Sequence, residues 1–124
     1  MLESLGECSL TDTSIPREVI VYRVDDSDRE PFTKWLNGLR DSKGRRCILR
    51  CMHRLKQGIY GDHKSLGEGV SELRIFFGPG YRVYLGEHEN KIVVLLGGDK
   101  DSQKNDIQRA KDYWEEYKNR EKLL

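Results

Sequence analysis

Hydrophobic and polar positions along the chain predict four strands. Glu18 to Val24 is rich in β-branched residues, and in Ser71 to Phe77 and Tyr81 to Leu85 the apolar side chains alternate with polar ones. A Gly-Pro-Gly turn joins these two alternating segments into a hairpin. Lys91 to Leu96 contains an unbroken apolar run, which is typical of a central strand covered on both faces.

Apolar residues at helical spacing predict three helices. The first begins at Pro31 and is ended by Gly38 and Asp41, the second runs from about Asp41 to Gln57, and the third from about Asp101 to Lys122. Gly58 to Gly69 contains four glycines and is expected to be a loop. The order β-α-α-β-β-β-α predicts an α+β fold of two layers, in which helices pack on a mainly antiparallel, four-stranded sheet.

The predicted hairpin places two arginines side by side. If its turn is tight, Arg74 and Arg82 lie opposite each other on neighbouring strands, and like charges so placed repel unless an anionic or polar group lies between them. The alternative is that each is neutralised by a carboxylate of its own. Arg74 would then pair with Glu72 or Glu68, and Arg82 with Glu87.

The net charge of +1 conceals a basic segment. Residues 34–64 carry nine bases and two acids, whereas residues 1–33 are acidic. Such a stretch favours a polyanion or an acidic partner, although many basic runs are only solvated helix faces. The candidate RNA-binding cations lie on the second predicted helix and in the loop after it: Lys43, Arg46, Arg50, Arg54 and Lys64.

The sequence lacks the motifs of common enzyme classes. It has no phosphate-binding GxxxxGK[ST] loop, no HExxH and no GxSxG. Cys8, Cys47 and Cys51 are expected to be free thiols, because no second ligand pair with metal spacing follows. We therefore expect neither a metal nor a cofactor.

The candidates for chemistry that remain are basic. Arg74 and Arg82 lie on paired strands, and Lys100 precedes the last predicted helix, whose N-terminal amides favour an anion. Guanidinium groups stabilise charge on phosphoryl oxygens. In RNA the adjacent 2′-OH is already the nucleophile, so a cluster of cations can promote cleavage without a metal.

The sequence also bears on location. The longest apolar run, Ile92 to Leu96, is far shorter than the roughly 18 residues needed to cross a bilayer. The acidic residues after Met1 do not fit a secretion signal. We therefore expect a cytoplasmic protein without membrane contact.

Three motifs carry a resemblance to a known family: GEGVSELR, GPGYRVY and GGDKDSQ. Together with WLNGLRD, they make Glu18 to Tyr117 similar to the RelE/ParE superfamily of bacterial toxins, specifically its HigB-like addiction module killer branch. The resemblance implies one RelE-like toxin domain at residues 18–124. Residues 1–17 fall outside it and are expected to form a flexible extension.

The resemblance implies a toxin of a type II toxin–antitoxin module, held inactive by a small helix-turn-helix antitoxin. RelE-type members cut mRNA in the ribosomal A site through attack of the 2′-OH, without a metal. The strand arginine of that family matches Arg82, and its basic position after the last strand matches Lys100. The chain departs from RelE at Asp101 and Ile107, where RelE has a second arginine and a catalytic tyrosine.

These departures leave several alternatives open. The general base remains open among Tyr81, Tyr84, His63 and Asp106. The leading prediction is a ribosome-dependent mRNA endoribonuclease that inhibits translation, in which Arg82 stabilises the phosphorane while Arg74 and Lys100 hold the phosphate. The first alternative is a non-enzymatic, ParE-like toxin that poisons DNA gyrase, and the second is a non-toxic relic or a nucleic-acid-binding module.

Overall fold

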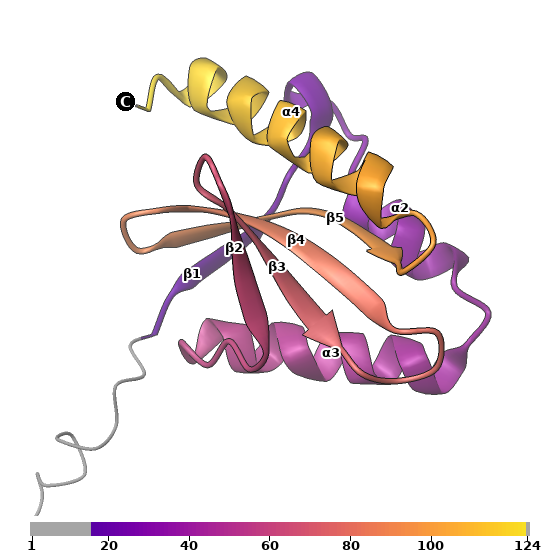
Figure 1. The fold of residues 1–124 in the computed structure, drawn as a ribbon. Helices are drawn as coiled ribbons and strands as arrows, with labels where there is room; N and C mark the ends of the chain where they lie inside the picture. Colours follow the sequence, from indigo (N-terminus) through magenta and orange to yellow (C-terminus); the bar gives the residue numbers. More distant parts are fainter. Residues whose placement is uncertain (1–15, 124) are drawn as a thin grey trace, which may run out of the picture.

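A computed structural model describes residues 16–123 of the chain. Figure 1 shows the elements in the order β1 (Glu18–Val21), the 3₁₀ turn η1 (Val24–Asp26), α2 (Pro31–Gly38), α3 (Ser42–Lys56), β2 (His63–Gly67), β3 (Val70–Ile75), β4 (Tyr81–His88), β5 (Lys91–Asp99) and α4 (Gln103–Glu121). The predicted extension at 1–17 lies outside the described residues except for Pro16 and Arg17, as does the expected thiol of Cys8.

The five strands form one mixed sheet in the order β1-β5-β4-β3-β2. β1 runs parallel to β5, and the other neighbours are antiparallel. The α+β class is as predicted, but the prediction of four strands is wrong because β2 lies within the segment 58–69 expected to be a loop. Gly67 and Gly69 have positive φ values of 85° and 81°, and they form the tight turn into β3 instead of preventing pairing.

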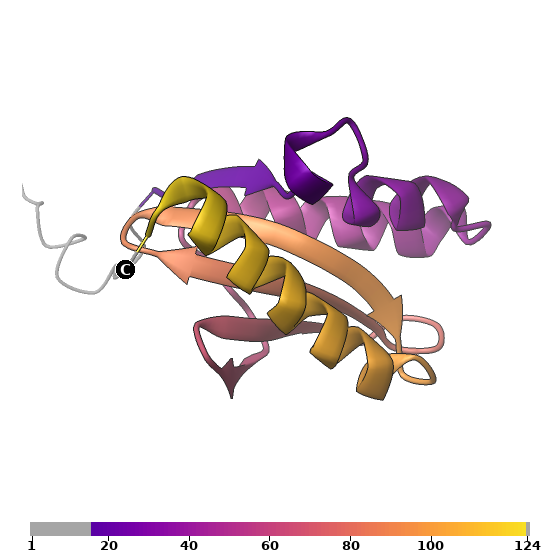
Figure 2. The ribbon, with the colours of Figure 1, turned by 90° about the horizontal axis from the view of Figure 1, so that it is seen from above.

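Helices cover both faces of the sheet, so the predicted two-layer arrangement is wrong as well. Figure 1 shows α4 on one face and α3 on the other, and Figure 2 shows α2 and α3 together on the side away from α4. β5 is a central strand, as predicted. Its Ile92 and Val94 pack towards α2 and α3, whereas Val93 and Leu95 pack towards α4.

Helix α3 is amphipathic as its sequence predicts. Ile48 and Leu55 are fully buried, and Cys47 and Cys51 are half-buried free thiols that pack against the same core cluster. The prediction that both cysteines belong to the apolar side of the helix is confirmed. None of the described helices is both long enough and apolar enough to cross a bilayer.

Glycines in the central strands bring the helices close to the sheet. A Cβ atom at Gly86 would collide with the buried ring of Trp114 on α4, and one at Gly98 with the carboxylate of Asp106. Since Gly98 pairs with Arg82 across β4 and β5, the first turns of α4 lie beside the part of the sheet that carries Arg82. The glycines therefore position α4 next to the candidate site.

Candidate functional site

The hairpin of β3 and β4 places Arg74 directly opposite Arg82, as predicted. Alternation along β4 buries Tyr81 and Val83 in the core under α2 and α3, and this turns Arg82 towards the α4 side of the sheet. The side chain of Arg82 is 15% exposed and that of Arg74 is 33% exposed. Both guanidinium groups are thus held at a half-buried position that remains open to solvent.

A single buried carboxylate lies between the two arginines. Glu72 is fully buried, and its Oε2 accepts a hydrogen bond from Arg74 Nε at 3.1 Å. Its Oε1 lies 3.6 Å from Arg82 Nε and accepts a hydrogen bond of 2.8 Å from Gln103 Nε2 at the start of α4. We call Glu72, Arg74, Arg82 and Gln103 the Glu72 cluster.

This pairing leaves the Glu72 cluster with an excess of positive charge. One carboxylate faces two guanidinium groups: the predicted alternative that Arg74 pairs with Glu72 is confirmed, and the alternative that Arg82 pairs with Glu87 is wrong. Glu87 does not contact Arg82 but forms an ion pair of 3.3 Å with Arg17. The cluster therefore carries two positive charges against one negative charge.

The way in which Glu72 contacts the arginines decides which donors remain available. Both guanidinium groups approach its carboxylate through Nε. Arg82 Nη1 also donates to the carbonyl of Gly80 at 3.3 Å, but neither terminal nitrogen of Arg74 nor Nη2 of Arg82 bonds to any residue of the range 16–123. Guanidinium nitrogens in this arrangement match the oxygens of a phosphate. The cluster can accordingly bind an anion at its outer side.

The two lysines predicted to join this site differ in their placement. Lys64 is exposed on β2 and pairs in register with Glu72, so it lies on the same face of the sheet as the cluster. Lys100 is exposed just after β5 and forms no ion pair within the described part of the chain. The structure brings Arg74 and Arg82 together and places Lys64 on their face of the sheet; within residues 16–123 neither lysine side chain forms a hydrogen bond or an ion pair with the cluster.

The backbone amides of the two residues just before α4 are already occupied. Asp99 Oδ1 accepts hydrogen bonds from the backbone N–H groups of Asp101, at 3.0 Å, and Ser102, at 3.1 Å. An anion at the N-terminus of α4 would lie close to this carboxylate, which would repel it. The cation-rich face of the hairpin is therefore the better anion site.

The tyrosines considered as general bases do not suit that role. Tyr81 lies on the opposite side of the sheet from Arg82, and burial, together with its hydrogen bond to Asp41, raises its pKa to about 12. Tyr84 faces the cluster, but burial and the nearby Glu72 carboxylate raise its pKa well above its usual range. Its hydroxyl is buried and bonds to no described residue. Both phenols therefore stay protonated at neutral pH.

The other two candidates for the general base have separate surroundings. His63 is exposed at the start of β2, where its Nδ1 lies 2.9 Å from the carbonyl oxygen of Gly61. Asp106 is 4% exposed and accepts a hydrogen bond of 2.5 Å from Ser102 Oγ. Neither makes a contact with Arg74 or Arg82 within residues 16–123.

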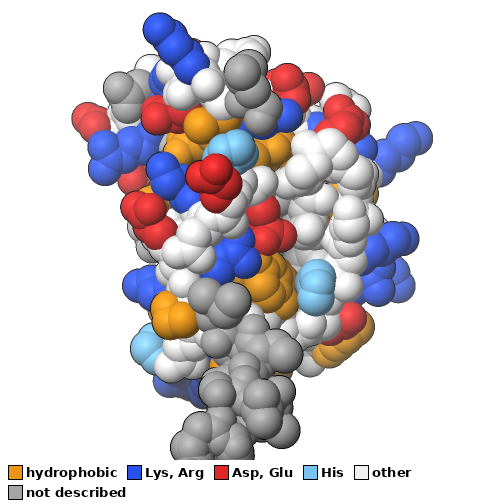
Figure 3. All heavy atoms as spheres, turned by 90° about the vertical axis from the view of Figure 1, so that its left-hand side faces the viewer, with side chains coloured by type: hydrophobic (Ala, Val, Ile, Leu, Met, Phe, Trp, Pro, Cys, Tyr) orange, Lys and Arg blue, Asp and Glu red, His pale blue; other side chains and the backbone are white. Residues whose placement is uncertain are grey.

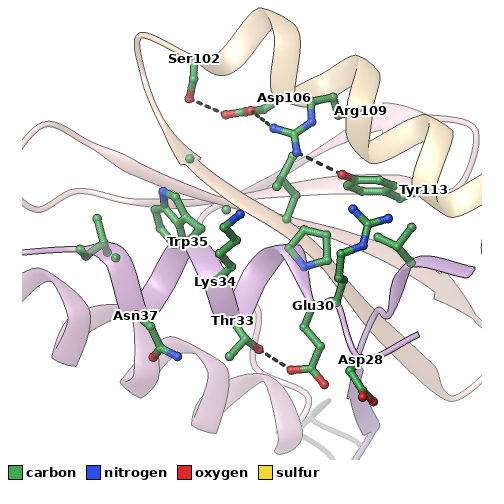
Figure 4. Close-up of a pocket in the computed structure, with 18 residues that line it drawn as sticks. Asp28, Glu30, Thr33, Lys34, Trp35, Asn37, Ser102, Asp106, Arg109 and Tyr113 are labelled. Carbon is green, nitrogen blue, oxygen red and sulfur yellow. Dashed lines mark hydrogen bonds and ion pairs between the residues drawn. The ribbon is translucent and has the colours of Figure 1, made fainter. Parts of the chain in front are cut away.

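A cavity of about 900 Å³ opens between α2, the end of β5 and α4 (Figure 4). Its charged lining is balanced between cations and carboxylates: Arg29, Lys34, Arg109, Asp28, Glu30 and Asp106. Figure 4 shows that part of this charge is paired, since Arg109 lies 3.8 Å from Asp106 and donates to Tyr113 at 3.0 Å. The cavity is thus less suited to a polyanion than the Glu72 cluster.

The cations predicted on α3 are all exposed. Lys43, Arg46, Arg50 and Arg54 form no ion pair with any described residue. In contrast, the end of the molecule drawn in Figure 3 mixes Lys and Arg side chains with Asp and Glu side chains. The unpaired cations of α3 therefore form a second basic surface, on the face of the sheet opposite α4.

Asp41 connects the start of α3 to β4. Its Oδ1 accepts the N–H of Gly44 at 2.9 Å and its Oδ2 accepts the hydroxyl of Tyr81 at 2.8 Å. These two bonds, the first being the stronger influence, hold the pKa of the Asp41 carboxyl below its usual range. A carboxyl with a lowered pKa stabilises the fold above its ordinary pKa, and this stability is lost as the pH falls through the folded-state value.

We expect Asp41→Asn to lower the stability of the protein at neutral pH, because asparagine still caps the helix but carries no charge. The difference in free energy of unfolding between the variant and the unmodified protein should shrink as the pH falls from about 5 to about 2. Urea unfolding followed by tryptophan fluorescence at several pH values measures this. A difference that stays constant over that range would show that ionisation of Asp41 has no role in stability.

Comparisons with known proteins place the chain beside one relative. No protein-family model matches it. An uncharacterized protein of Haemophilus influenzae is 44% identical to the chain over 81 residues, which are 64% of this chain and 82% of that protein. The two proteins belong to one family. This kinship covers most of the length of the Haemophilus protein, and it gives no activity for either member.

Sequence reasoning missed two members of the cluster as functional residues. Glu72 was considered only as a partner that would neutralise Arg74, although alternation placed both on one face of the strand. Gln103 gave no signal, because its approach to Glu72 depends on how α4 packs over the sheet.

Proposed function

We propose that this chain is a RelE/ParE-like toxin of a type II toxin–antitoxin module and acts as a metal-independent, ribosome-dependent mRNA endoribonuclease. The observation that carries the proposal is the arrangement of Arg74 and Arg82, which share one buried carboxylate and keep terminal nitrogens free for a phosphate. Two of the three motifs that resemble the superfamily contain these arginines, GEGVSELR with Arg74 and GPGYRVY with Arg82.

The proposed reaction needs charge stabilisation more than a protein nucleophile. The 2′-hydroxyl gives its proton to solvent water, and its oxygen attacks the adjacent phosphorus. The bond from phosphorus to the 5′-oxygen breaks, and this oxygen takes up a proton from water, so the products are a 2′,3′-cyclic phosphate and a 5′-hydroxyl. Negative charge develops on the phosphoryl oxygens in between. Arg82, which is 15% exposed, stabilises this charge more strongly than a fully solvated cation would, and Arg74 and Lys64 hold the phosphate.

The remaining basic residues fit a role in binding. Lys43, Arg46, Arg50 and Arg54 on α3 lie across the sheet from the Glu72 cluster, and they are proposed to contact ribosomal RNA. Lys100 extends from the end of β5, where it can reach the same RNA. A cognate helix-turn-helix antitoxin would silence the toxin by covering one of these basic surfaces.

A reconstituted translation reaction tests the proposal. Purified protein is added to ribosomes that translate an end-labelled reporter mRNA, and the expected result is new cuts within the reading frame that require ribosomes. Fragments should end in a 2′,3′-cyclic phosphate. Intact mRNA would contradict the proposal. Intact mRNA combined with broken plasmid DNA in a parallel reaction with DNA gyrase would favour the ParE-like alternative.

A further inference from the structure

A groove of about 340 Å³ lies between α3 and the end of β3, apart from the outer side of the Glu72 cluster. We call it the α3–β3 groove. Arg50 and Arg54 line it from α3, and Arg74 and Phe76 line it from the β3 end. Arg74 connects the two places, because this residue borders the groove while its guanidinium group binds Glu72 on the other face of the sheet.

Phe76 is the most exposed large hydrophobic side chain among residues 16–123. It is 81% exposed, compared with 50% for Leu49 and 42% for Ile59, which also lines the groove. The backbone around it is fixed by a hydrogen bond from Phe77 N–H to Ile75 O at 2.9 Å. An aromatic ring held outward on an ordered turn is a surface on which another planar group can stack.

The charge of the groove is strongly positive. Arg50 and Arg54 line it from α3 and Arg74 borders it, whereas Asp62 is the one acidic residue among the described residues that do so. Arg50 and Arg54 are exposed and have no ion-pair partner within the described ranges. Proteins that bind single-stranded nucleic acid combine these two features, a basic groove that follows the phosphates and an aromatic ring that stacks on a base.

We propose that the α3–β3 groove binds single-stranded RNA, with a base stacked on Phe76 and the adjoining phosphates on Arg50 and Arg54. The inference rests on the proposed function, since the strand in the groove is the same strand that Arg74 and Arg82 cut. It adds the path of that strand and gives Phe76 a role. The competing occupant is a protein partner, which would contact the Phe76 ring through hydrophobic packing and not through stacking of a base.

Binding of a fluorescein-labelled, 12-nucleotide single-stranded RNA to the full chain, followed by fluorescence anisotropy without ribosomes, tests this. Phe76→Ala and Phe76→Leu should each weaken binding about 5-fold to 100-fold, because stacking is lost. Phe76→Tyr should bind within about twofold of the unmodified protein. The leucine variant keeps an apolar side chain, so it separates stacking from hydrophobic contact.

Salt dependence tests the phosphate contacts separately. Replacing both Arg50 and Arg54 by glutamine should reduce the slope of log K against log salt by about 1.4, which corresponds to two phosphates on a single strand. Lys122→Gln is the matched control, because Lys122 is an exposed cation at the C-terminal end of α4, far along the helix from the Glu72 cluster. This variant should leave the slope unchanged.

The outcomes separate this inference from the proposed function. Equal binding by all Phe76 variants, or full binding by Phe76→Leu with weak binding by Phe76→Ala, would overturn the stacking site. If RNA binding requires the ring of Phe76 but the protein cuts no mRNA on ribosomes, the RNA-binding groove is supported and the proposed nuclease activity is wrong. If the protein cuts mRNA on ribosomes but all Phe76 variants bind the oligonucleotide equally, the nuclease activity is supported and the stacking site is wrong.

Discussion

Replacement of Arg82 by alanine is expected to slow ribosome-dependent mRNA cleavage by roughly 10²-fold to 10³-fold, the effect of removing one donor that stabilises a developing oxyanion. Arg82 is the less exposed of the two arginines, at 15% against 33%, so its charge is less screened by water. Single-turnover cleavage of an end-labelled mRNA on programmed ribosomes measures the rate.

Two further variants make this prediction specific. Arg82→Lys keeps the charge but loses the planar fork, so it should restore only part of the rate. Arg109→Ala removes an arginine that also lies near a buried carboxylate, Asp106, but beside the cavity under α4. The Arg109 variant should retain a rate within about twofold of the unmodified protein. Equal losses of cleavage rate in the Arg82 and Arg109 variants would show that the rate depends on the total positive charge of the protein and not on the position of Arg82.

Local patterns predicted those elements whose side chains are partly buried. Pro31 and Gly38 bound α2 where the sequence places its ends, and the register of the hairpin follows from the Gly-Pro-Gly turn and the alternation on each side of it. The missed strand, β2, is an exposed edge whose residues show no alternation of apolar and polar types. Its pairing is determined by β3, which the sequence of β2 does not reveal.

The candidate site was predictable to the level of the strands but not beyond it. The opposition of Arg74 and Arg82 requires an anionic or polar group between them, and Glu72 meets that requirement. That one carboxylate would serve both arginines depends on a diagonal contact across the strands, which the alternation of one strand cannot specify. The position of Gln103 depends in turn on the packing of α4 against Gly98.

Glu72→Ala is expected to destabilise the protein by about 3–5 kcal/mol, because it leaves two guanidinium groups at a half-buried position without their carboxylate. A loss of this size is a large fraction of the roughly 5–15 kcal/mol that stabilises a domain. Glu72→Gln keeps the shape and one acceptor oxygen, so its cost should be lower, about 1–3 kcal/mol. Urea unfolding measures both values.

The glutamine variant also shows whether Glu72 positions the arginines for cleavage. Removing the carboxylate raises the charge of the Glu72 cluster from +1 to +2 by our assignment of its ion pairs, so RNA should bind at least as tightly and with a steeper dependence on salt. The cleavage rate of bound mRNA should nevertheless fall, because Nε of each arginine loses its charged anchor. A purely structural Glu72 would leave that rate unchanged in the folded Glu72→Gln protein. Tighter binding with slower cleavage is therefore the result that assigns Glu72 to the orientation of Arg74 and Arg82.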